Sequence, residues 1–155
     1  MASPADKESP SKCGRVAAIC ISKKKGVPKS EIPSAQVIEG YGLEADAHGG
    51  DWHRQVSLLS MEQIETMRQK GLVVQPGSFA ENITTVDFDL DSIRVGDCLK
   101  IGESVLLEVT QIGKECHTRC AIYYKVGECI MPERGVFARV KRGGTIARGD
   151  DVTQV

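Results

Sequence analysis

The sequence has 155 residues, of which 41% are hydrophobic, with 20 lysine and arginine residues against 21 aspartate and glutamate residues. This length and composition are typical of one globular domain with its own hydrophobic core. A net charge of −1 gives no field that would attract polyanions, and no block of five or six like charges forms an interaction tail. We therefore do not expect a dedicated nucleic-acid-binding protein.

The longest apolar stretch near the N-terminus covers residues 16–21, far short of the ~20 residues that a membrane span requires. We therefore expect a soluble, cytoplasmic protein without a membrane partner. Its six cysteines in 155 residues fall below the roughly 8–10% that marks a disulfide scaffold. Without an export signal, we interpret them as thiols, metal ligands or core residues.

The first predicted elements follow a polar segment. Residues 1–13 are rich in serine, proline and charge, which predicts a flexible tail before a domain that covers residues 14–155. Residues 16–22 form a short apolar run that becomes basic at residues 23–26, as expected for a buried strand that enters a surface turn. Four glycines within residues 40–50 predict a loop or an irregular strand.

A strand at residues 53–59 is followed by the only predicted helix. Ser60 and Gln63 match a capping box, in which Ser60 accepts from the amide of Gln63 and the Gln63 side chain reaches back. The helix should begin at Met61, and Gly71 supplies the residue that follows its C-terminus.

The rest of the chain has the pattern of strands and turns. Residues 82–86, 98–101 and 104–112 are predicted strands, and the last two form a hairpin around a turn at residues 102–103. Residues 135–140 alternate between apolar and other side chains, and the following turn leads to residues 145–147, which predicts a second hairpin.

A short pattern, I-x-x-G-D-x-aliphatic, occurs at residues 93–99 and again at residues 146–152. Glycine permits a sharp bend, and the aspartate side chain can accept hydrogen bonds from turn amides. Each copy is therefore expected to begin a strand at a corner of a closed sheet.

The most unusual segment contains three thiols and an imidazole within 14 positions, at Cys116, His117, Cys120 and Cys129. An ordinary thiol with a pKa of ~8.5 is only slightly ionised at neutral pH, so a reactive cysteine needs nearby positive charge or a metal. Lys114, His117 and Arg119 could supply that charge to Cys116. The residues leave three alternatives open: a zinc site of all four side chains, small buried core residues, or a reactive Cys116 that acts as nucleophile, sulfur carrier or soft metal ligand.

Three further segments carry candidate binding residues. Residues 46–55 contain His48, His53 and Arg54 among glycines, which is a plausible oxyanion or phosphate cradle or, alternatively, a solvated loop. Residues 76–83 form a turn that leads into a strand at Asn82. Residues 131–135 form another turn, in which Arg134 is able to bind an anion.

Together, ordered motifs along the chain resemble the MOSC domain, named for the C-terminal part of molybdenum cofactor sulfurase. The resemblance covers roughly residues 14–155 and is closest to the small stand-alone bacterial members. The motifs that carry it are GLEADAHGG at residues 42–50, HRQVSLL at 53–59, PGSFAENIT at 76–84, VGD at 95–97, EVTQ at 108–111 followed by Cys116, and GVFARV at 135–140.

The resemblance implies a mainly β fold, a MOSC-type β-barrel with one or few short helices. It also implies that the protein binds the pyranopterin molybdenum cofactor (molybdopterin) or carries sulfur for it. The reactive cysteine of the family corresponds to Cys116, which would be a molybdenum ligand or the carrier of persulfide sulfur. We expect the anionic end of the cofactor to be bound by His48, His53, Arg54, Asn82 and Arg134.

Two positions depart from the family pattern, which usually has glycine where this chain has Ala45 and Ala80. Both changes replace one small residue by another, so they bear on the backbone path at the site more than on the fold. The chain also lacks the pyridoxal-phosphate part of the larger sulfurases, so sulfur on Cys116 would come from a donor such as a cysteine desulfurase. The expected partners are therefore the molybdenum cofactor or its assembly enzymes and this sulfur donor.

Two other functions remain as alternatives. One is a non-catalytic interaction domain in which the cysteines and histidine of residues 116–129 bind zinc. The other is the molybdenum-dependent component of a reductase for N-hydroxylated compounds. Because the chain has no iron–sulfur or flavin signature, such a reductase would depend on partners for its electrons.

Overall fold

The computed structural model of the chain describes residues 12–113 and 134–155. The described part is mainly β, with one short α-helix and one 3-10 helix, which confirms the predicted fold class. The elements in chain order are β1 (Cys13–Ile21), β2 (Ser30–Ile32), β3 (Ser34–Ile38), β4 (Gly42–Leu43), β5 (Val56–Ser60), α2 (Met61–Gln69), β6 (Ile83–Val86), η1 (Leu90–Ser92), β7 (Cys98–Ile101), β8 (Val105–Ile112), β9 (Val136–Arg142), β10 (Gly144–Ala147) and β11 (Asp151–Gln154).

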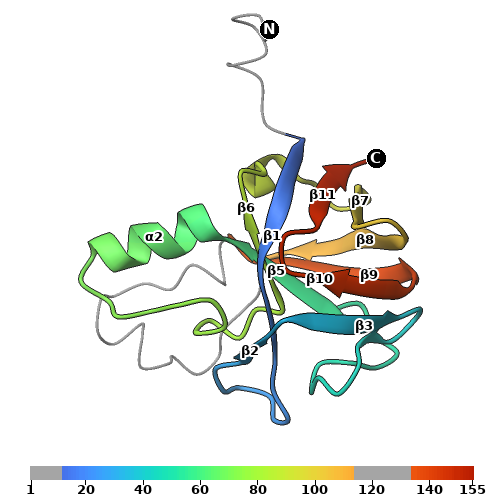
Figure 1. The fold of residues 1–155 in the computed structure, drawn as a ribbon, viewed down its shortest axis with the longest axis horizontal. Coiled ribbons are helices and arrows are strands. Elements are labelled where there is room, and N and C mark those ends of the chain that lie inside the picture. The colour runs from blue at the N-terminus through green and yellow to red at the C-terminus, as the bar shows by residue number, and fades with distance from the viewer. Residues whose placement is uncertain (1–11, 114–133) are drawn as a thin grey trace, which may run out of the picture.

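Seven strands close into a barrel in the order β1, β11, β7, β8, β9, β5 and β6, with β6 pairing again with β1. All neighbours are antiparallel except β5 and β6, which are parallel. The first and last strands lie side by side (Figure 1), because Cys13 of β1 pairs with Thr153 of β11. The ordered strand therefore begins one residue before the expected domain boundary.

The repeated I-x-x-G-D pattern marks two corners of the barrel, as predicted. Asp97 accepts a hydrogen bond from the Arg94 amide at 2.9 Å, and Asp150 accepts one from the Ala147 amide at 2.8 Å. β7 begins directly after the first aspartate and β11 directly after the second, and these two strands pair with each other. The repeated sequence pattern therefore corresponds to two equivalent turns, each directly before one of two adjacent strands.

The hairpin predicted between residues 135–140 and 145–147 is wrong. Both edges of β9 are already occupied, one by β8 and the other by β5, so β10 pairs instead with β3 in a separate sheet of order β10-β3-β4. The chain changes sheets at Gly143, where an added Cβ would lie only 2.5 Å from the Val37 carbonyl oxygen. The glycine pair at residues 143–144 resembles a hairpin turn in the sequence, but in the structure it is where the chain passes from one sheet to the other.

Helix α2 begins as predicted, because the Ser60 hydroxyl oxygen accepts from the Gln63 amide at 3.1 Å. The reciprocal half of the capping box is wrong, since the Gln63 side chain donates to Asp91 of η1 at 3.0 Å. Gly71 follows the helix with φ +93° and donates to the Arg68 carbonyl. The Gln63 side chain thus hydrogen-bonds to a carboxylate that the fold brings close, instead of to the backbone amide of Ser60.

Two apolar clusters support this architecture. The larger fills the barrel with aliphatic side chains from its strands, and the smaller lies where α2 packs on the outer face of β5 and β9, with Ile64, Met67 and Phe137 among its members. Every residue of β5 is buried because this strand has the barrel interior on one face and the helix on the other. No helix in the described part of the chain has the length and hydrophobicity that a membrane crossing requires.

Candidate functional site

Trp52, in the segment between β4 and β5, is surrounded by basic side chains. The His48 ring stacks almost parallel to the indole, with ring centres 6.3 Å apart, and the His53 ring meets its edge at 5.8 Å. The Arg54 guanidinium carbon and the Lys25 ammonium each lie 4.7 Å from an indole ring centre. We call these five residues the Trp52 cluster. It brings together three predicted site residues, His48, His53 and Arg54.

Arg54 carries a buried donor that has no partner among the residues that the structure describes. Its guanidinium lies near two aromatic rings, those of Trp52 and of Phe137, the latter at 5.6 Å. The Nε atom is shielded from solvent and makes no hydrogen bond with any described residue. Leaving such a donor unsatisfied costs about 1–3 kcal/mol, and more when the group is charged. Arg54 is therefore prepared to donate to an acceptor that residues 12–113 and 134–155 do not supply.

His53 connects the cluster to the end of β8. Its Nε2 atom lies 2.8 Å from the side-chain oxygen of Gln111, and its carbonyl accepts from the Thr110 hydroxyl. Gln111 in turn donates to the Gly113 carbonyl at 2.6 Å. These contacts hold the segment between β4 and β5 against β8, and Gln111 precedes Cys116 by only five positions in the sequence.

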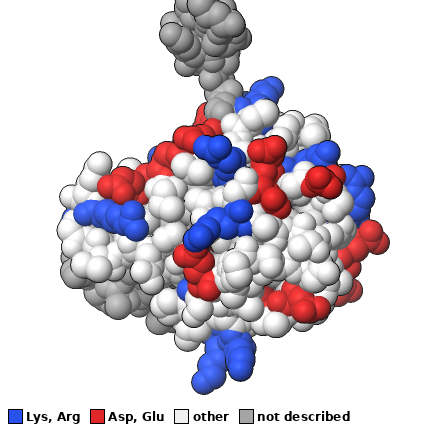
Figure 2. All heavy atoms as spheres, in the orientation of Figure 1, with Lys and Arg blue, Asp and Glu red and all other residues white. Residues whose placement is uncertain are grey.

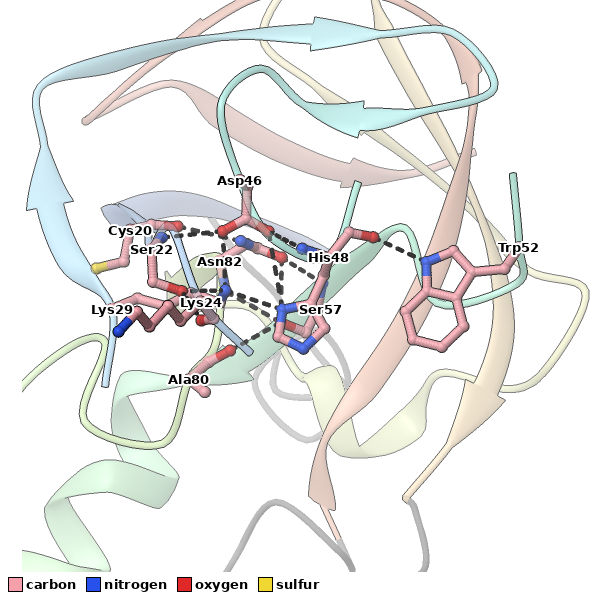
Figure 3. A network of polar contacts seen from close by, with 10 residues as sticks. All are labelled: Cys20, Ser22, Lys24, Lys29, Asp46, His48, Trp52, Ser57, Ala80 and Asn82. Atoms are coloured by element: carbon pink, nitrogen blue, oxygen red, sulfur yellow. Dashed lines mark hydrogen bonds and ion pairs between the residues drawn. The ribbon is translucent and has the colours of Figure 1, made fainter. Parts of the chain in front are cut away.

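Behind the cluster lies a buried ion pair of Lys29 and Asp46, whose side chains are both fully inaccessible to solvent. Lys29 Nζ lies 2.8 Å from Asp46 Oδ1, 3.0 Å from the Ser22 hydroxyl and 2.9 Å from His48 Nδ1. Asp46 also accepts from the backbone amides of Ser22 and His48, both at 3.1 Å. Figure 3 shows this network and, on its far side, the Trp52 indole donating to the His48 carbonyl.

These contacts keep Asp46 ionised. Burial acts to raise its pKa, but the hydrogen bond from Lys29, the amide of Ser22 and the positive charge of Lys29 outweigh it and hold the pKa below its usual value. A buried carboxylate of this kind persists only when it is paired and hydrogen-bonded. The pair is therefore a structural unit of two charges that depend on each other.

The backbone of Lys29 is held by the turn that contains Gly77. The Lys29 amide donates to the Gly77 carbonyl at 2.8 Å, and a Cβ on Gly77 would lie only 2.2 Å from the Lys29 carbonyl oxygen. Gly77 also has φ +92°, a conformation that favours glycine. The turn of the PGSFAEN motif therefore packs against the backbone of the buried lysine and holds it in place.

Asn82, another predicted site residue, is fully buried and joins three strands. Its side-chain oxygen accepts from the Ser57 amide at 3.0 Å, and its side-chain nitrogen donates to the Cys20 carbonyl at 3.1 Å. Its backbone bonds to the same two residues. Asn82 thus holds β1, β5 and the start of β6 together beneath the Lys29–Asp46 pair.

Two buried acidic groups lie close to this network but are not prepared for reaction. Burial raises the pKa of the Glu81 carboxyl, although the Phe79 amide and the Thr84 hydroxyl donate to it. Burial, followed by the charge of Glu81, raises the pKa of the Cys20 thiol to about 12. Cys20 therefore stays protonated at neutral pH and is a poor nucleophile.

Arg134 makes a different contact from the other predicted residues. Its guanidinium pairs with the carboxylate of Asp91 in η1 at 3.7 Å, and both side chains are about half exposed. Asp91 borders a hollow of about 390 Å³ that Glu62 and Asp89 also line. Among the contacts of the described residues, none joins Arg134 to the Trp52 cluster.

Cys116, His117, Cys120 and Cys129 lie outside the described residues, and so does the alternative zinc site of these four side chains. Within residues 12–113 and 134–155, no three His, Cys, Asp or Glu side chains are grouped so that they could hold a metal ion.

Figure 2 shows acidic and basic side chains interspersed over the face in view, as expected from a net charge near zero. A basic projection stands out at the lower end, where the turn between β1 and β2 extends in Figure 1. This turn contains three exposed lysines at positions 23–25. One of them, Lys25, belongs to the Trp52 cluster, so the positive charge of the turn adjoins the site.

Both alanines that replace family glycines adopt left-handed backbone conformations, with φ +68° at Ala45 and +63° at Ala80. The first directly precedes Asp46, and the second lies in the turn that supports Lys29. The site therefore keeps a left-handed backbone conformation at two positions where the Cβ atom of alanine disfavours it. The strain costs about 1–2 kcal/mol at each position.

Replacing either alanine by glycine should stabilise the protein by about 0.5–1 kcal/mol, because relief of the left-handed strain exceeds the extra chain entropy of glycine in the unfolded state. Urea unfolding of Ala45→Gly and Ala80→Gly measures this. Ala47→Gly is the matched control, since Ala47 lies in the same loop without a positive φ. The control should lose stability, and a loss of the same size in all three variants would contradict the prediction.

Lys29 and Ser22 were not predicted from the sequence. A lysine between proline and serine in a polar connection carries no signal of burial, and its partner Asp46 is 17 positions away. Trp52 offered a better signal, because it is the only tryptophan of the chain and lies within the segment singled out for its histidines.

Comparisons with known proteins agree with this fold. The YuaD protein from Bacillus subtilis matches 90% of this chain and 94% of its own, with 17% identity and a TM-score of 0.75. YiiM from Geobacillus stearothermophilus matches with 19% identity over 92% of this chain and 75% of its own, at a TM-score of 0.66. YiiM from Escherichia coli also has 19% identity, over 91% and 69% of the two chains, at a TM-score of 0.61.

At these identities, the solved structures establish a common fold and no more. A search among curated proteins gives no match. The family model of the MOSC domain matches residues 44–153, a range that begins at the loop of Asp46 and His48 and ends within β11. With the seven-stranded barrel and the motifs around Trp52, this match shows that the chain belongs to the MOSC domain family.

Proposed function

We propose that this protein binds the pyranopterin molybdenum cofactor through the Trp52 cluster, or carries sulfur for that cofactor, with Cys116 as the reactive thiolate. Membership of the MOSC domain family supports the general link to molybdenum cofactor metabolism. The cofactor carries a phosphate group and a dithiolene, so its protein site needs hydrogen-bond donors and positive charge. The residues of the Trp52 cluster fit this requirement.

The buried Nε of Arg54, which has no partner in the described part of the chain, is the observation that carries the proposal. Arginine has five N–H donors in a planar fork and no acceptor, which suits phosphate oxygens. The aromatic rings of Trp52 and Phe137 beside the guanidinium lower its exposure to water and so strengthen its attraction for an anion. Lys25, on the same indole, adds a second positive charge.

The other candidates receive distinct roles in this proposal. His53, tied to Gln111, positions the cluster beside β8, and Asn82 holds the strands beneath it. Arg134 remains a candidate for binding only if it exchanges Asp91 for the ligand. Bound molybdenum would supply redox or sulfur chemistry, and Cys116 would supply the thiolate that ligates it or carries the sulfur. A cysteine desulfurase in the cytoplasm is the proposed sulfur donor.

Arg54→Met should weaken retention of the cofactor by about 10- to 100-fold, because a hydrogen bond to a charged group contributes about 1.5–3 kcal/mol. The measurement is the amount of pterin per protein, determined after expression with cofactor supply and gentle purification. Native mass spectrometry of the same sample identifies the bound species.

Arg142→Met is the matched control. Arg142 lies at the far end of β9 and donates to the Ser104 carbonyl on the surface, so its loss should leave the pterin content unchanged. Equal pterin content in wild type and Arg54→Met would contradict the proposal. Wild-type protein that retains no pterin under any supply would contradict cofactor binding and leave only the sulfur-carrier function, which the loading of Cys116 tests.

A further inference from the structure

The ammonium group of Lys29 has three N–H bonds and three neighbours within hydrogen-bonding distance. They are Asp46 Oδ1 at 2.8 Å, the Ser22 hydroxyl oxygen at 3.0 Å and His48 Nδ1 at 2.9 Å. We propose that Lys29 and Asp46 are positioning residues that hold His48 in the neutral form with its proton on Nε2. His48 would then act as a hydrogen-bond donor in the Trp52 cluster, and not as a metal ligand.

The first step concerns the charge of Lys29. Its side chain and that of Asp46 are both sealed from solvent and lie in direct contact. A carboxylate whose pKa is held low needs a cation beside it, since an unpaired buried charge is strongly unfavourable. The lysine is therefore an ammonium group, which donates three hydrogen bonds and accepts none.

The second step concerns the ring of His48. Because Lys29 can only donate, the contact of 2.9 Å requires a lone pair on Nδ1. A proton on Nδ1 would place two hydrogens between this atom and the Lys29 nitrogen, and neither nitrogen could then accept. A neutral imidazole carries one proton, and when Nδ1 accepts, that proton is on Nε2.

The third step concerns the orientation of the residue. The His48 amide donates to Asp46 Oδ2 at 3.1 Å, and its carbonyl accepts from the Trp52 indole at 2.8 Å. The ring lies almost parallel to the indole, at an interplanar angle of 6°. Figure 3 shows His48 held between the buried pair and Trp52. Backbone and ring are thus fixed together, as for a group that must present one atom in one direction.

The consequence is that three of the five residues of the Trp52 cluster act as hydrogen-bond donors. Arg54 and Lys25 have no acceptor atoms, and His48 in this tautomer has its only lone pair directed at Lys29. Such a set recognises acceptor oxygens of the phosphate class, and its His48 Nε2 cannot ligate a metal while it bears a proton. The identity of the ligand rests on the proposed function, whereas the tautomer does not.

Long-range proton–nitrogen correlation spectra of uniformly ¹⁵N-labelled protein test the tautomer directly. The chain has three histidines, so His48→Gln and His53→Gln variants assign the signals. At about pH 8, well above the ordinary histidine pKa of about 6.5, we expect a pyridine-type shift for His48 Nδ1 and a pyrrole-type shift for Nε2. The opposite pattern, or an average of the two tautomers, would overturn the proposal.

The role of Lys29 is tested with the variant Lys29→Met/Asp46→Asn, which removes both charges. The His48 shifts should move toward an average of the two tautomers, while His53, which contacts Gln111 instead, should not change. Unchanged His48 shifts in this variant would contradict the role of Lys29.

A measurement on wild-type protein keeps this role testable if that variant does not fold. The Lys29 nitrogen should give a protected ammonium signal, and a neutral amine signal would overturn the assignment. None of these spectra needs the cofactor. A failure of cofactor binding therefore leaves the tautomer result intact, and an unexpected tautomer leaves the Arg54 experiment intact.

Discussion

Lys29→Met is expected to lower the free energy of unfolding by about 3–5 kcal/mol, the largest loss of stability that we predict for a single substitution of this protein. Methionine fills most of the volume of lysine, so packing changes little. The loss arises because the carboxylate of Asp46, fully inaccessible to solvent, would no longer have a counter-ion. The hydrogen bonds from Lys29 to Ser22 and His48 would be lost as well. Urea unfolding followed by circular dichroism measures the change.

The double variant Lys29→Met/Asp46→Asn separates charge from packing. Replacing both members of a buried ion pair is often close to neutral, whereas removing one partner is strongly destabilising. The double variant should therefore be more stable than Lys29→Met. Asparagine keeps an acceptor for the amides of Ser22 and His48, which helps to preserve the loop. A double variant no more stable than Lys29→Met would show that the loss comes from packing rather than from an unpaired charge.

The pH dependence provides a second check with a defined sign. In the wild type, the pKa of Asp46 is lower folded than unfolded, so this group contributes stability above its unfolded pKa of about 3.9 and loses it as the pH falls through the folded pKa. In Lys29→Met, burial is no longer opposed by the hydrogen bond and charge of Lys29, so the pKa of Asp46 should be raised. The destabilisation by the unpaired Asp46 carboxylate then disappears as the pH falls below that raised pKa, because the carboxyl group becomes protonated and neutral. The difference between the two proteins should therefore shrink on acidification.

Most of the fold could be predicted from local patterns. The strand at β1, the hairpin of β7 and β8, the corner turns and helix α2 are each encoded within a few consecutive residues. The two errors concern partners distant in the sequence. The turn at Gly143 resembles a hairpin, but strand pairing depends on which edges are already occupied, and the Gln63 side chain prefers Asp91, 28 positions away.

Some residues of the candidate site could be singled out from the sequence, but its construction could not. Histidines and an arginine among glycines were compatible with an anion site or a solvated loop. The structure gathers His48, His53 and Arg54 around Trp52, and anion binding there stays a prediction. The buried Lys29 could not be recognised, because in one sequence a lysine normally indicates an exposed position. Its burial depends on a carboxylate and a turn that only the folded chain brings together.

Cys116→Ser is expected to abolish sulfur loading completely, because serine cannot form a persulfide. In the proposed transfer, the Cys116 thiolate attacks the outer sulfur of a persulfide on the donor, a new S–S bond forms, and the donor cysteine leaves as a thiolate. Incubation with a cysteine desulfurase and cysteine, followed by intact-protein mass spectrometry, should show the mass of one added sulfur atom in the wild type and none in the variant.

Cys20→Ser is the matched control, since burial keeps that thiol protonated with a pKa of about 12, and its loss should leave the loading unchanged. Cys129→Ser should affect stability but not sulfur loading. Equal loss of loading in Cys116→Ser and Cys129→Ser, accompanied by the release of stoichiometric zinc from both, would contradict the proposal and favour a zinc-binding interaction domain. Loading that persists in Cys116→Ser would assign the reactive thiol to another cysteine and remove the basis for placing the chemistry at Cys116.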